Sequence, residues 1–509
     1  MKMGEKNPSA PGFFWIPLFT VVLGAFAAIL NNSSVNVAIP KLMAIFGVDT
    51  DRIQWVVTTY MLTSGVVIPV TGFLGDYLGS KRLYVIALSV FTLGSLLCSL
   101  AWSLNIMIVA RIIQGIGGGA IMPVSMAIIY KIAPRDKIGS ALGVWGIAAM
   151  AAPVIGPTLG GYVIDRLNWH FIFSLNIPVG ILGILLAVFL LPSEKPHLER
   201  KFDFWGFVLV TGGCFALLLA LSQGHKEGWA SQYIVNLLLG GSFALILFVI
   251  IEVGQDNPIL DIRILKNKIF SLSIVASGLM TIGLFGGVFL IPLFTQNIQG
   301  LTPLQTGLLL MPAAIVTGLV MPLSGILFDL IGFFIPGLIG LFITAWGTWE
   351  LHILSLETSM QHIQFIMVIR SIGMGLAMMP ITTAGMNTIS NLKIGEASAL
   401  SNVIRQIAAS FGIALLTSIL QQRQIFHAAR LSEAVSVPLP VASSIINQLG
   451  QQIGLGREGY EFGLGLLAMQ VQRLGFTQAI GDTFLVATLF VFLAIPFVIL
   501  MKHRNKTVS

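Results

Sequence analysis

Charged residues and cysteines are scarce in this sequence. Of its 509 residues, 10% are charged and 56% are hydrophobic, whereas a soluble domain carries about 25% charged residues. The composition argues against a soluble protein and indicates a membrane protein. The two cysteines, Cys98 and Cys214, both lie in apolar runs, which argues against a disulfide framework and favours buried packing.

Patterns of residues that carry out catalysis are also lacking. No G-x-x-x-x-G-K-[ST] motif occurs, so we expect no nucleotide hydrolysis by the chain. No Ser-His-Asp constellation and no metal-ligand spacing stands out, and all 21 carboxylates fall at or near the ends of apolar runs or in loops. We therefore expect no enzyme, no cofactor, no metal and no nucleic-acid partner.

Long apolar runs are what the sequence has instead. A helix needs about 20 apolar residues to cross the hydrocarbon core of a bilayer, and by that measure the chain predicts fourteen spans. The first run is too long for a signal-peptide h-region and no small-residue cleavage site follows it, so we expect an uncleaved anchor. The runs lie at about 13–39, 53–74, 83–102, 105–130, 139–164, 169–191, 203–222, 233–252, 269–294, 304–328, 333–354, 361–389, 397–421 and 480–501.

Lysine and arginine residues set the expected orientation in the membrane. With the N-terminus in the cytoplasm, eighteen of them, Arg405 among these, are assigned to the inner side and eight to the outer side. Only Arg111 and Arg370 stay within spans. We expect a bacterial cytoplasmic (inner) membrane protein with both termini inside and a polar, glutamine-rich loop at about 422–479 outside.

The chain contains an internal repeat. GFLGDYLG at 72–79 and GILFDLIG at 325–332 share one pattern, and about one span later an arginine lies inside each apolar run, at Arg111 and Arg370. Each run then closes on Met-Pro. The repeat predicts two six-span bundles with two linker helices between them, an arrangement typical of major facilitator transporters. We expect these parts at 1–192, 193–268 and 269–509.

At these residues the chain resembles the major facilitator superfamily, and within it the fourteen-span drug:proton antiporter branch of EmrB/QacA-like exporters. GFLGDYLGSKR resembles the loop between spans two and three, RIIQGIGGG the fourth-span motif, and APVIGPTLGG the fifth-span antiporter motif. The resemblance implies secondary active export by alternating access. The matching positions of the first and third motifs are Gly72, Asp76, Gly79, Lys81 and Arg82, and Gly156, Pro157, Gly160 and Gly161.

The resemblance implies that Asp76 and Arg82 form a latch between the two halves. Asp76 can pair with Lys81 and Arg82 or lie at a helix N-terminus, and a solvated turn with topogenic charges remains the alternative. The second copy keeps Asp329 but has Phe333 and Phe334 where basic residues would stand. We therefore expect a weaker second latch.

Two further motifs predict structure within the membrane. Arg111 stays protonated and so cannot carry a proton, but it can anchor a buried network that includes Gln114, one turn away, with Arg370 as its counterpart. Gly156-Pro157 removes a backbone donor and predicts a bend in span five.

The first span departs from the branch that the chain resembles. An aspartate regarded as a proton carrier usually stands there, whereas this chain has Asn31, which is neutral at every physiological pH. We expect Asn31 and Asn32 to line the central cavity, and Ser33, Ser34 and Asn36 to bond between helices. Either the proton carrier has moved to a boundary acid, Glu350 or Glu396, or coupling is loose and a cationic substrate is driven out some other way.

We expect export of amphipathic, drug-like compounds. The alternatives are export of a metabolite such as a peptide, siderophore or fatty acid, and a non-transporting receptor or assembly factor on the same fold. The outer loop could dock a periplasmic adaptor if the host has two membranes, or could simply cap the membrane surface. Candidate cavity residues, each of which could equally be plain packing, are Trp145, Met150, Met280 and Met311.

Overall fold

The computed structural model describes residues 14–193, 202–255, 258–436 and 456–505. Over these ranges the chain is helical and contains no strand. Thirteen helices are long and apolar enough to cross a membrane, or fourteen if the bent pair Arg135–Pro153 and Ile155–Ile164 counts as one span. The prediction of an all-α polytopic membrane protein with fourteen spans is confirmed.

The first six spans pack into one bundle. Proline at Pro69 divides the second span into α3 and α4, joined by a single 3-10 turn, because proline cannot donate the helical hydrogen bond. The sixth span is likewise divided into α8 and α9. The helices are α1 (Trp15–Phe46), α2 (Thr50–Ile53), α3 (Trp55–Val67), α4 (Thr71–Leu78), α5 (Ser80–Ser99), α6 (Leu104–Ile132), α7 (Ile138–Arg166), α8 (His170–Ser174) and α9 (Asn176–Leu190).

Two linker helices follow, α10 (Phe204–Glu227) and α11 (Gln232–Gly254). Each begins at a side-chain cap: Asp203 accepts from the Gly206 N–H and Ser231 from the Ile234 N–H. The two helices pack against each other, and α10 also packs on α3 and α16. The linker therefore contacts both halves.

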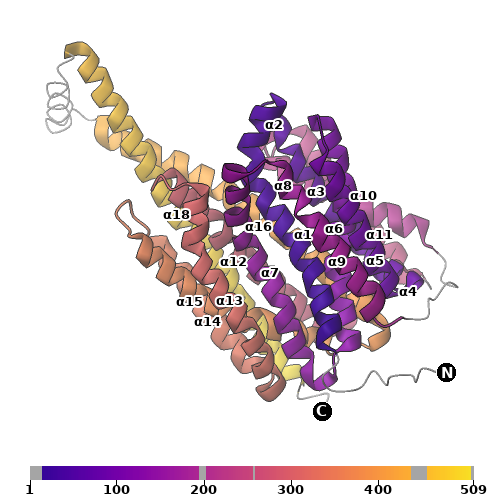
Figure 1. The fold of residues 1–509 in the computed structure, drawn as a ribbon. Helices are drawn as coiled ribbons and strands as arrows, with labels where there is room; N and C mark the ends of the chain where they lie inside the picture. Colours follow the sequence, from indigo (N-terminus) through magenta and orange to yellow (C-terminus); the bar gives the residue numbers. More distant parts are fainter. Residues whose placement is uncertain (1–13, 194–201, 256–257, 437–455, 506–509) are drawn as a thin grey trace, which may run out of the picture.

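The second bundle repeats the order of the first. Its helices are α12 (Lys268–Asn297), α13 (Pro303–Ile331), α14 (Phe334–Glu350), α15 (Met360–Met386), α16 (Ile394–Ser436) and α18 (Gly456–Asn505). The two bundles lie side by side, and α1 begins at the same end of the molecule at which α18 ends (Figure 1). We call this end the terminal face and the opposite end the hairpin face.

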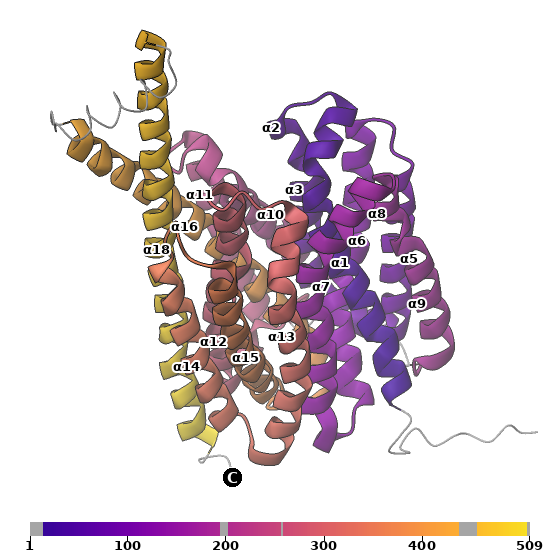
Figure 2. The ribbon, with the colours of Figure 1, turned by 60° about the vertical axis from the view of Figure 1, so that its left-hand side comes forward.

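The hairpin face is named for two helices that run on beyond the bundle. Figures 1 and 2 show α16 and α18 projecting from it. Within the described residues, the prediction of a loop at about 422–479 is wrong, because the Gln-, Arg-, Ala- and Leu-rich sequence after the apolar run continues the helix. Arg423 and His427 of α16 both reach Asp482 of α18 at 2.6 Å and join the base of the hairpin. Residues 437–455 lie outside the described part.

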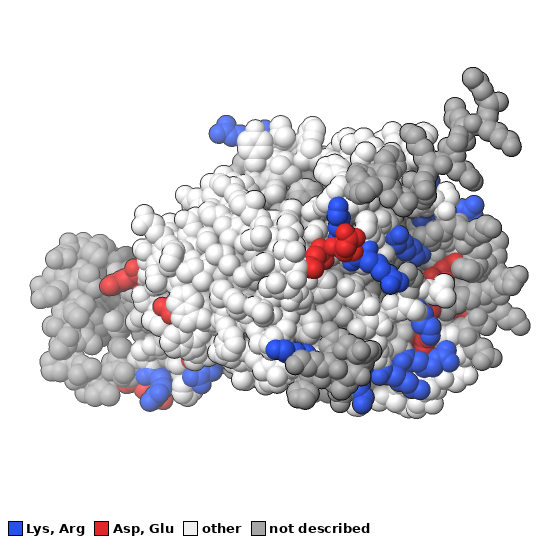
Figure 3. Space-filling model, turned by 90° about the horizontal axis from the view of Figure 1, so that it is seen from below, with Lys and Arg blue, Asp and Glu red and all other residues white. Residues whose placement is uncertain are grey.

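Basic side chains gather on the terminal face (Figure 3). Exposed basic residues in the connections and in the adjoining helix ends at this face include Arg82, Lys131, Arg135, Lys266 and Lys268. Arg405, which the sequence assigned to this side, instead lies within α16, eleven residues after Ile394. That spacing places its Cα about 16 Å along the helix. The assignment was wrong because it counted basic residues by sequence distance from loops.

Contact between the two halves runs mainly along α7 and α13, and along α16 with α6 and α4. Glycines allow the first pair to approach closely near the terminal face. A Cβ added to Gly325 would lie 2.1 Å from the Gly139 carbonyl oxygen, and one added to Gly143 would lie 2.7 Å from that of Met321. Backbone therefore meets backbone between the halves at this end.

Candidate functional site

The polar stretch in α1 packs against the bend in α7. Ser33 Oγ donates to the Pro153 carbonyl at 2.7 Å and Ser34 Oγ to the Gly156 carbonyl at 3.0 Å. Because Pro157 has no N–H, the Pro153 carbonyl lacks its helical donor, and Ser33 supplies one. The two serines therefore bond between helices, as the sequence suggested.

The bend itself measures 41° between Arg135–Pro153 and Ile155–Ile164. It therefore falls just before the predicted Gly156-Pro157 position, at the carbonyl that Pro157 leaves without a donor. A Cβ on Gly156 would lie 2.5 Å from Ser33 Cβ, and one on Gly160 would lie 2.8 Å from the Ser34 oxygen. These glycines let α1 approach α7, whereas a Cβ on Gly161 would meet Leu304 of α13 at 3.8 Å.

The asparagines of α1 have three different environments. Asn31 is 1% exposed, and its Oδ1 accepts from Asn176 Nδ2 of α9 at 2.9 Å, while its own Nδ2 has no partner. Asn32 is half-buried with an unpartnered Oδ1, and Asn36 is exposed. Asn31 thus faces α9 in this conformation, about 100° around the helix from Asn32.

Arg111 of α6 lies in a buried network within the first half. Its Nε donates to the Val56 carbonyl at 2.9 Å and its Nη1 to Gln114 Oε1 at 2.6 Å. Gln114 Nε2 then donates to Ser95 Oγ of α5 at 2.7 Å, and the guanidinium lies 4.3 Å from the Tyr60 ring centroid. The network joins α3, α5 and α6.

Arg370 of α15 holds the matching place in the second half. Its Nη2 donates to the carbonyls of Gly283 and Leu284 in α12, at 2.6 and 3.1 Å. Its Nε donates to Thr348 Oγ1 of α14 at 3.0 Å. A Cβ on Gly287 would lie 2.3 Å from the guanidinium, so the buried arginine requires glycine there. Both buried arginines thus anchor helices of their own half.

Asp329, at the end of α13, caps the first turn of α7 in the other half. Its carboxylate accepts from the N–H groups of Gly139 and Ser140, both at 3.1 Å, and from Ser140 Oγ at 2.8 Å. A negative charge at a helix N-terminus is stabilised by the helix dipole. We expected this second latch to be weaker because basic residues are missing there. Its donors are instead two backbone N–H groups and one serine hydroxyl of α7.

Asp76, at the end of α4, lies in the equivalent place against α16. A Cβ on Gly395 would lie 3.6 Å from Asp76 Oδ1, and one on Gly72 would lie 3.0 Å from Glu396 Cα. The expected partner Lys81 donates instead to the carbonyls of Val188 and Leu191 at the end of α9, at 2.7 and 2.8 Å. The other latch residues lie at this turn, with Gly79 in the left-handed region at φ +85° and Arg82 exposed.

A sequence signal for these two contacts was missed. Lys137-Ile138-Gly139 opens α7 and Lys393-Ile394-Gly395 opens α16. The tripeptide marks the two helix N-termini that the aspartates approach. Asp329 and Asp76 therefore each lie at the start of a helix of the opposite half, and both helices open with the same tripeptide.

The candidate cavity residues are placed differently from one another. Trp145 of α7 is 1% exposed and its Nε1 has no partner, and the Arg405 guanidinium of α16 lies 6.0 Å from its ring centroid. Met280 is buried in α12 and Met311 is 39% exposed on α13. Met150 belongs to α7, but its side chain lies outside the described residues. Two methionines that the sequence did not single out, Met321 and Met379, contact Gly146.

The two proton-carrier candidates lie at opposite faces. Glu350 ends α14 at the hairpin face and is half-buried, whereas Glu396 is 3% exposed in the first turn of α16 at the terminal face. Neither lies at mid-depth in the bundle.

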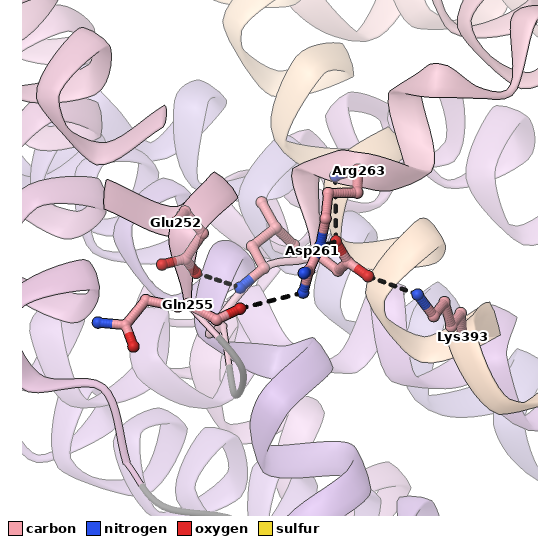
Figure 4. Close-up of polar contacts among 6 residues, drawn as sticks. Glu252, Gln255, Asp261, Arg263 and Lys393 are labelled. Atoms are coloured by element: carbon pink, nitrogen blue, oxygen red, sulfur yellow. Dashed lines mark hydrogen bonds and ion pairs between the residues drawn. The ribbon is translucent and has the colours of Figure 1, made fainter. Parts of the chain in front are cut away.

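An ion-pair cluster joins the end of the linker to the base of α16 (Figure 4). Asp261 contacts Lys393 at 2.6 Å and Arg263 at 2.8 Å. Burial alone would raise the pKa of Asp261, but its hydrogen bonds to Lys393 and Arg263 outweigh burial and hold the pKa below its usual value. Glu252, at the end of α11, accepts from the Leu260 N–H at 2.8 Å. The sequence did not single out this cluster.

Comparison with known proteins identifies the family. The sequence pattern of the Major Facilitator Superfamily matches residues 21–413. The chain belongs to this superfamily. It is 38% identical to an uncharacterized MFS-type transporter, YhcA of Bacillus subtilis, over 86% of this chain and 81% of that relative. Multidrug export protein EmrB of Haemophilus influenzae is 29% identical over 94% of both chains.

Among solved structures, the superfamily's proton:xylose symporter XylE has the same fold, with a TM-score of 0.60 at 13% identity over 95% of this chain and 96% of that one. The protein is thus a multi-pass membrane transporter and not an enzyme. In the superfamily, the substrate site lies between the two six-helix halves.

Proposed function

We propose that the protein exports amphipathic, drug-like compounds across the cytoplasmic membrane by alternating access, coupled to protons. The observation that carries the proposal is the pair of contacts at the terminal face, where Asp329 caps α7 and Asp76 approaches the start of α16. Each joins one half to the other and can be made or broken as the halves rock. The multidrug exporter among the relatives supports the substrate class.

The rocking bodies are residues 1–192 and 269–509, with 193–268 as the linker. We place the terminal face in the cytoplasm because basic residues gather there. The contacts between the halves at that face then close the transporter on the cytoplasmic side. The substrate would leave on the opposite side, at the hairpin face. Asp329 and Asp76 are the latches of this state.

The test is flux of a panel of fluorescent amphipathic dyes from proteoliposomes. A Gly143→Leu variant supplies the internal control, because its side chain would meet the Met321 carbonyl and Pro322 Cα, at 2.7 and 2.8 Å from a bare Cβ. We expect it to prevent closure and to stop flux, while Gly212→Leu, with nothing within 4 Å, transports normally. Dye flux equal to that of empty liposomes overturns the proposal.

Proton coupling has two candidate routes. In one, Glu350 and Glu396 take up and release protons at opposite faces. In the other, coupling is loose and the charge of the substrate contributes. Proton flux on substrate addition distinguishes them: a flux unchanged in Glu350→Gln and Glu396→Gln excludes the first route. The second is supported if Asn31→Asp introduces a pH dependence of transport that the wild type lacks.

The projecting hairpin of α16 and α18 is the proposed docking element for a periplasmic adaptor in a two-membrane host. Exposed apolar side chains on it, Ile425 at 72% and Met469 at 60%, support a protein partner. Pull-down of a co-expressed adaptor should fail after Ile425→Asp with Met469→Asp. Unchanged recovery of the adaptor with this variant contradicts the assignment.

A further inference from the structure

Arg405 is a third arginine in the membrane, and its surroundings differ from those of the other two. It lies about 16 Å along α16 from Ile394, near the middle of a hydrocarbon core about 30 Å thick. Arg111 and Arg370 donate to backbone carbonyls of neighbouring helices. Among the described residues, Arg405 donates to the Asn402 side chain and forms no ion pair.

A charged group at this depth is unfavourable unless it is paired or hydrated. Arg405 keeps its proton in any environment that a protein offers, so it cannot escape this penalty by becoming neutral. Its side chain is only partly buried, and a ligand can therefore reach it. The residues that the structure describes supply no carboxylate that pairs with this arginine.

A second unused donor meets Arg405 from the opposite half. The guanidinium lies 6.0 Å from the ring centroid of Trp145 on α7, and Trp145 Nε1–H is buried without an acceptor. Buried donors of this kind are normally paired. Beside Trp145, Gly146 contacts Met321 and Met379, which belong to α13 and α15. A cation and an indole N–H thus lie together between the halves, and flexible apolar side chains flank the next residue of α7.

We infer that this place binds the carboxylate, or another anionic head group, of an amphipathic substrate. The head group accepts from Arg405 and from Trp145 Nε1, and the apolar part packs on the methionines. Since Arg405 and Trp145 belong to different halves, rocking of the halves separates the two donors and weakens binding. The inference rests on the proposed export function and names its substrate class.

Anionic substrates also fit the scarcity of acids at mid-depth. A membrane potential that is negative inside drives an anion outward by about 2.3 kcal/mol per charge per 100 mV. This contribution adds to any supplied by protons and needs no carboxylate in the bundle. Asn31 in place of an acid is then compatible with directed export.

The experiment compares three probes that differ only in head group: pyrenebutyrate, pyrenebutanamide and pyrenebutylamine. Binding to the full chain in nanodiscs is followed by energy transfer from tryptophan to pyrene, with empty nanodiscs subtracted. Flux of the same probes is measured in proteoliposomes under an imposed potassium diffusion potential without a pH gradient. We expect the wild type to bind the carboxylate about tenfold more tightly than the amide.

Two substitutions test the role of Arg405. Arg405→Gln should abolish the preference for the carboxylate and leave amide affinity within about threefold. Asn402→Asp places a carboxylate beside Arg405 with little change of shape and should abolish the preference by competition, which covers the case of an unfolded Arg405→Gln. Arg52→Gln, which removes an exposed charge in α2, should behave as wild type.

The outcomes separate this inference from the proposed function. Transport of the probes without a carboxylate preference, or a preference that survives both substitutions, overturns the anion site and leaves export standing. Failure of the wild type to bind or move any of the three probes overturns both. Carboxylate flux that follows the imposed potential and is lost in Arg405→Gln supports the site.

Discussion

Ser33 Oγ donates to the carbonyl of Pro153, the one backbone acceptor that Pro157 leaves without a helical donor. The same relationship recurs in the second half, where Ser324 Oγ donates to the Leu376 carbonyl at 3.0 Å, four residues before Pro380. Since the bilayer core has no water to satisfy such a carbonyl, a serine on the neighbouring helix takes its place. These two serines therefore donate to the carbonyls that prolines in neighbouring helices leave without a helical donor.

Substitution of Ser33 should reveal this role. Ser33→Ala leaves the Pro153 carbonyl without a donor and should lower stability by about 0.6–1.7 kcal/mol, the range of such bonds between membrane helices. Ser34→Ala is the matched control, because Gly160 keeps its N–H and can still serve the Gly156 carbonyl. Thermal unfolding in detergent should show the larger loss for Ser33→Ala, and equal losses would contradict the explanation.

Close helix packing makes a second prediction. A Cβ on Gly117 of α6 would lie 2.3 Å from the Phe91 nitrogen and 2.4 Å from the Ala87 carbonyl oxygen of α5. Gly117→Ala should therefore destabilise the protein by about 1–3 kcal/mol. Gly212→Ala on α10 meets nothing within 4 Å and should stabilise its helix by about 0.5–1 kcal/mol. Melting temperatures of the two variants should shift in opposite directions, and a tolerated Gly117→Ala would refute the packing.

The Asp329 latch should set how often the terminal face opens. Asp329→Asn removes the charge at the start of α7, an interaction worth up to about 2 kcal/mol when partly buried. A cysteine at Ser398, which is buried and donates to the Pro123 carbonyl at 2.9 Å, reports on opening. Its alkylation should become about five- to thirtyfold faster. Asp136→Asn, on the same face but exposed, should not change the rate.

The Asp261 cluster predicts a pH response. A carboxylate whose pKa is lowered on folding contributes stability above its ordinary value of about 4, and this is lost only as pH falls through the lowered pKa. The ion pairs of Asp261 therefore contribute the same stability at pH 5 and at pH 8. In Lys393→Gln with Arg263→Gln, the backbone N–H of residue 263 still donates to Asp261, but both cations are lost. Burial then raises the pKa of Asp261 relative to the wild type, so the variant should be destabilised less at pH 5 than at pH 8. Melting temperatures across this range, with Lys266→Gln as control, provide the check.

The sequence predicted the features that depend on local composition or on repetition. Apolar runs are sufficient to find the spans, and the repeat is sufficient to pair Arg111 with Arg370. The partners of polar residues could not be predicted, because Asn31 and Asn176 are 145 positions apart and meet only after the bundle forms. The continuation of the two spans as projecting helices was missed, because hydropathy ends where the apolar run ends, whereas helix propensity continues.

Arg405 shows a further limit of sequence reasoning. When basic residues are counted to orient the chain, each is assumed to lie in a loop outside the membrane. That assumption fails for an arginine such as Arg405, whose position depends on its contacts in the folded protein. Its neighbour Trp145 lies 260 positions earlier and carries no charge. Only the folded chain brings the two together.

Alternating movement of the two faces is the central claim, and spin-label distances measure it directly. In a background with both cysteines replaced by alanine, one labelled pair joins Ala44 and Gln296 at the hairpin face, and another joins Asp136 and Leu392 at the terminal face. All four side chains are exposed and lie at equivalent places in the two halves. On addition of a transported substrate, we expect one distance to shorten as the other lengthens. Distances that stay unchanged, or that move together in the same direction, would contradict export by alternating access.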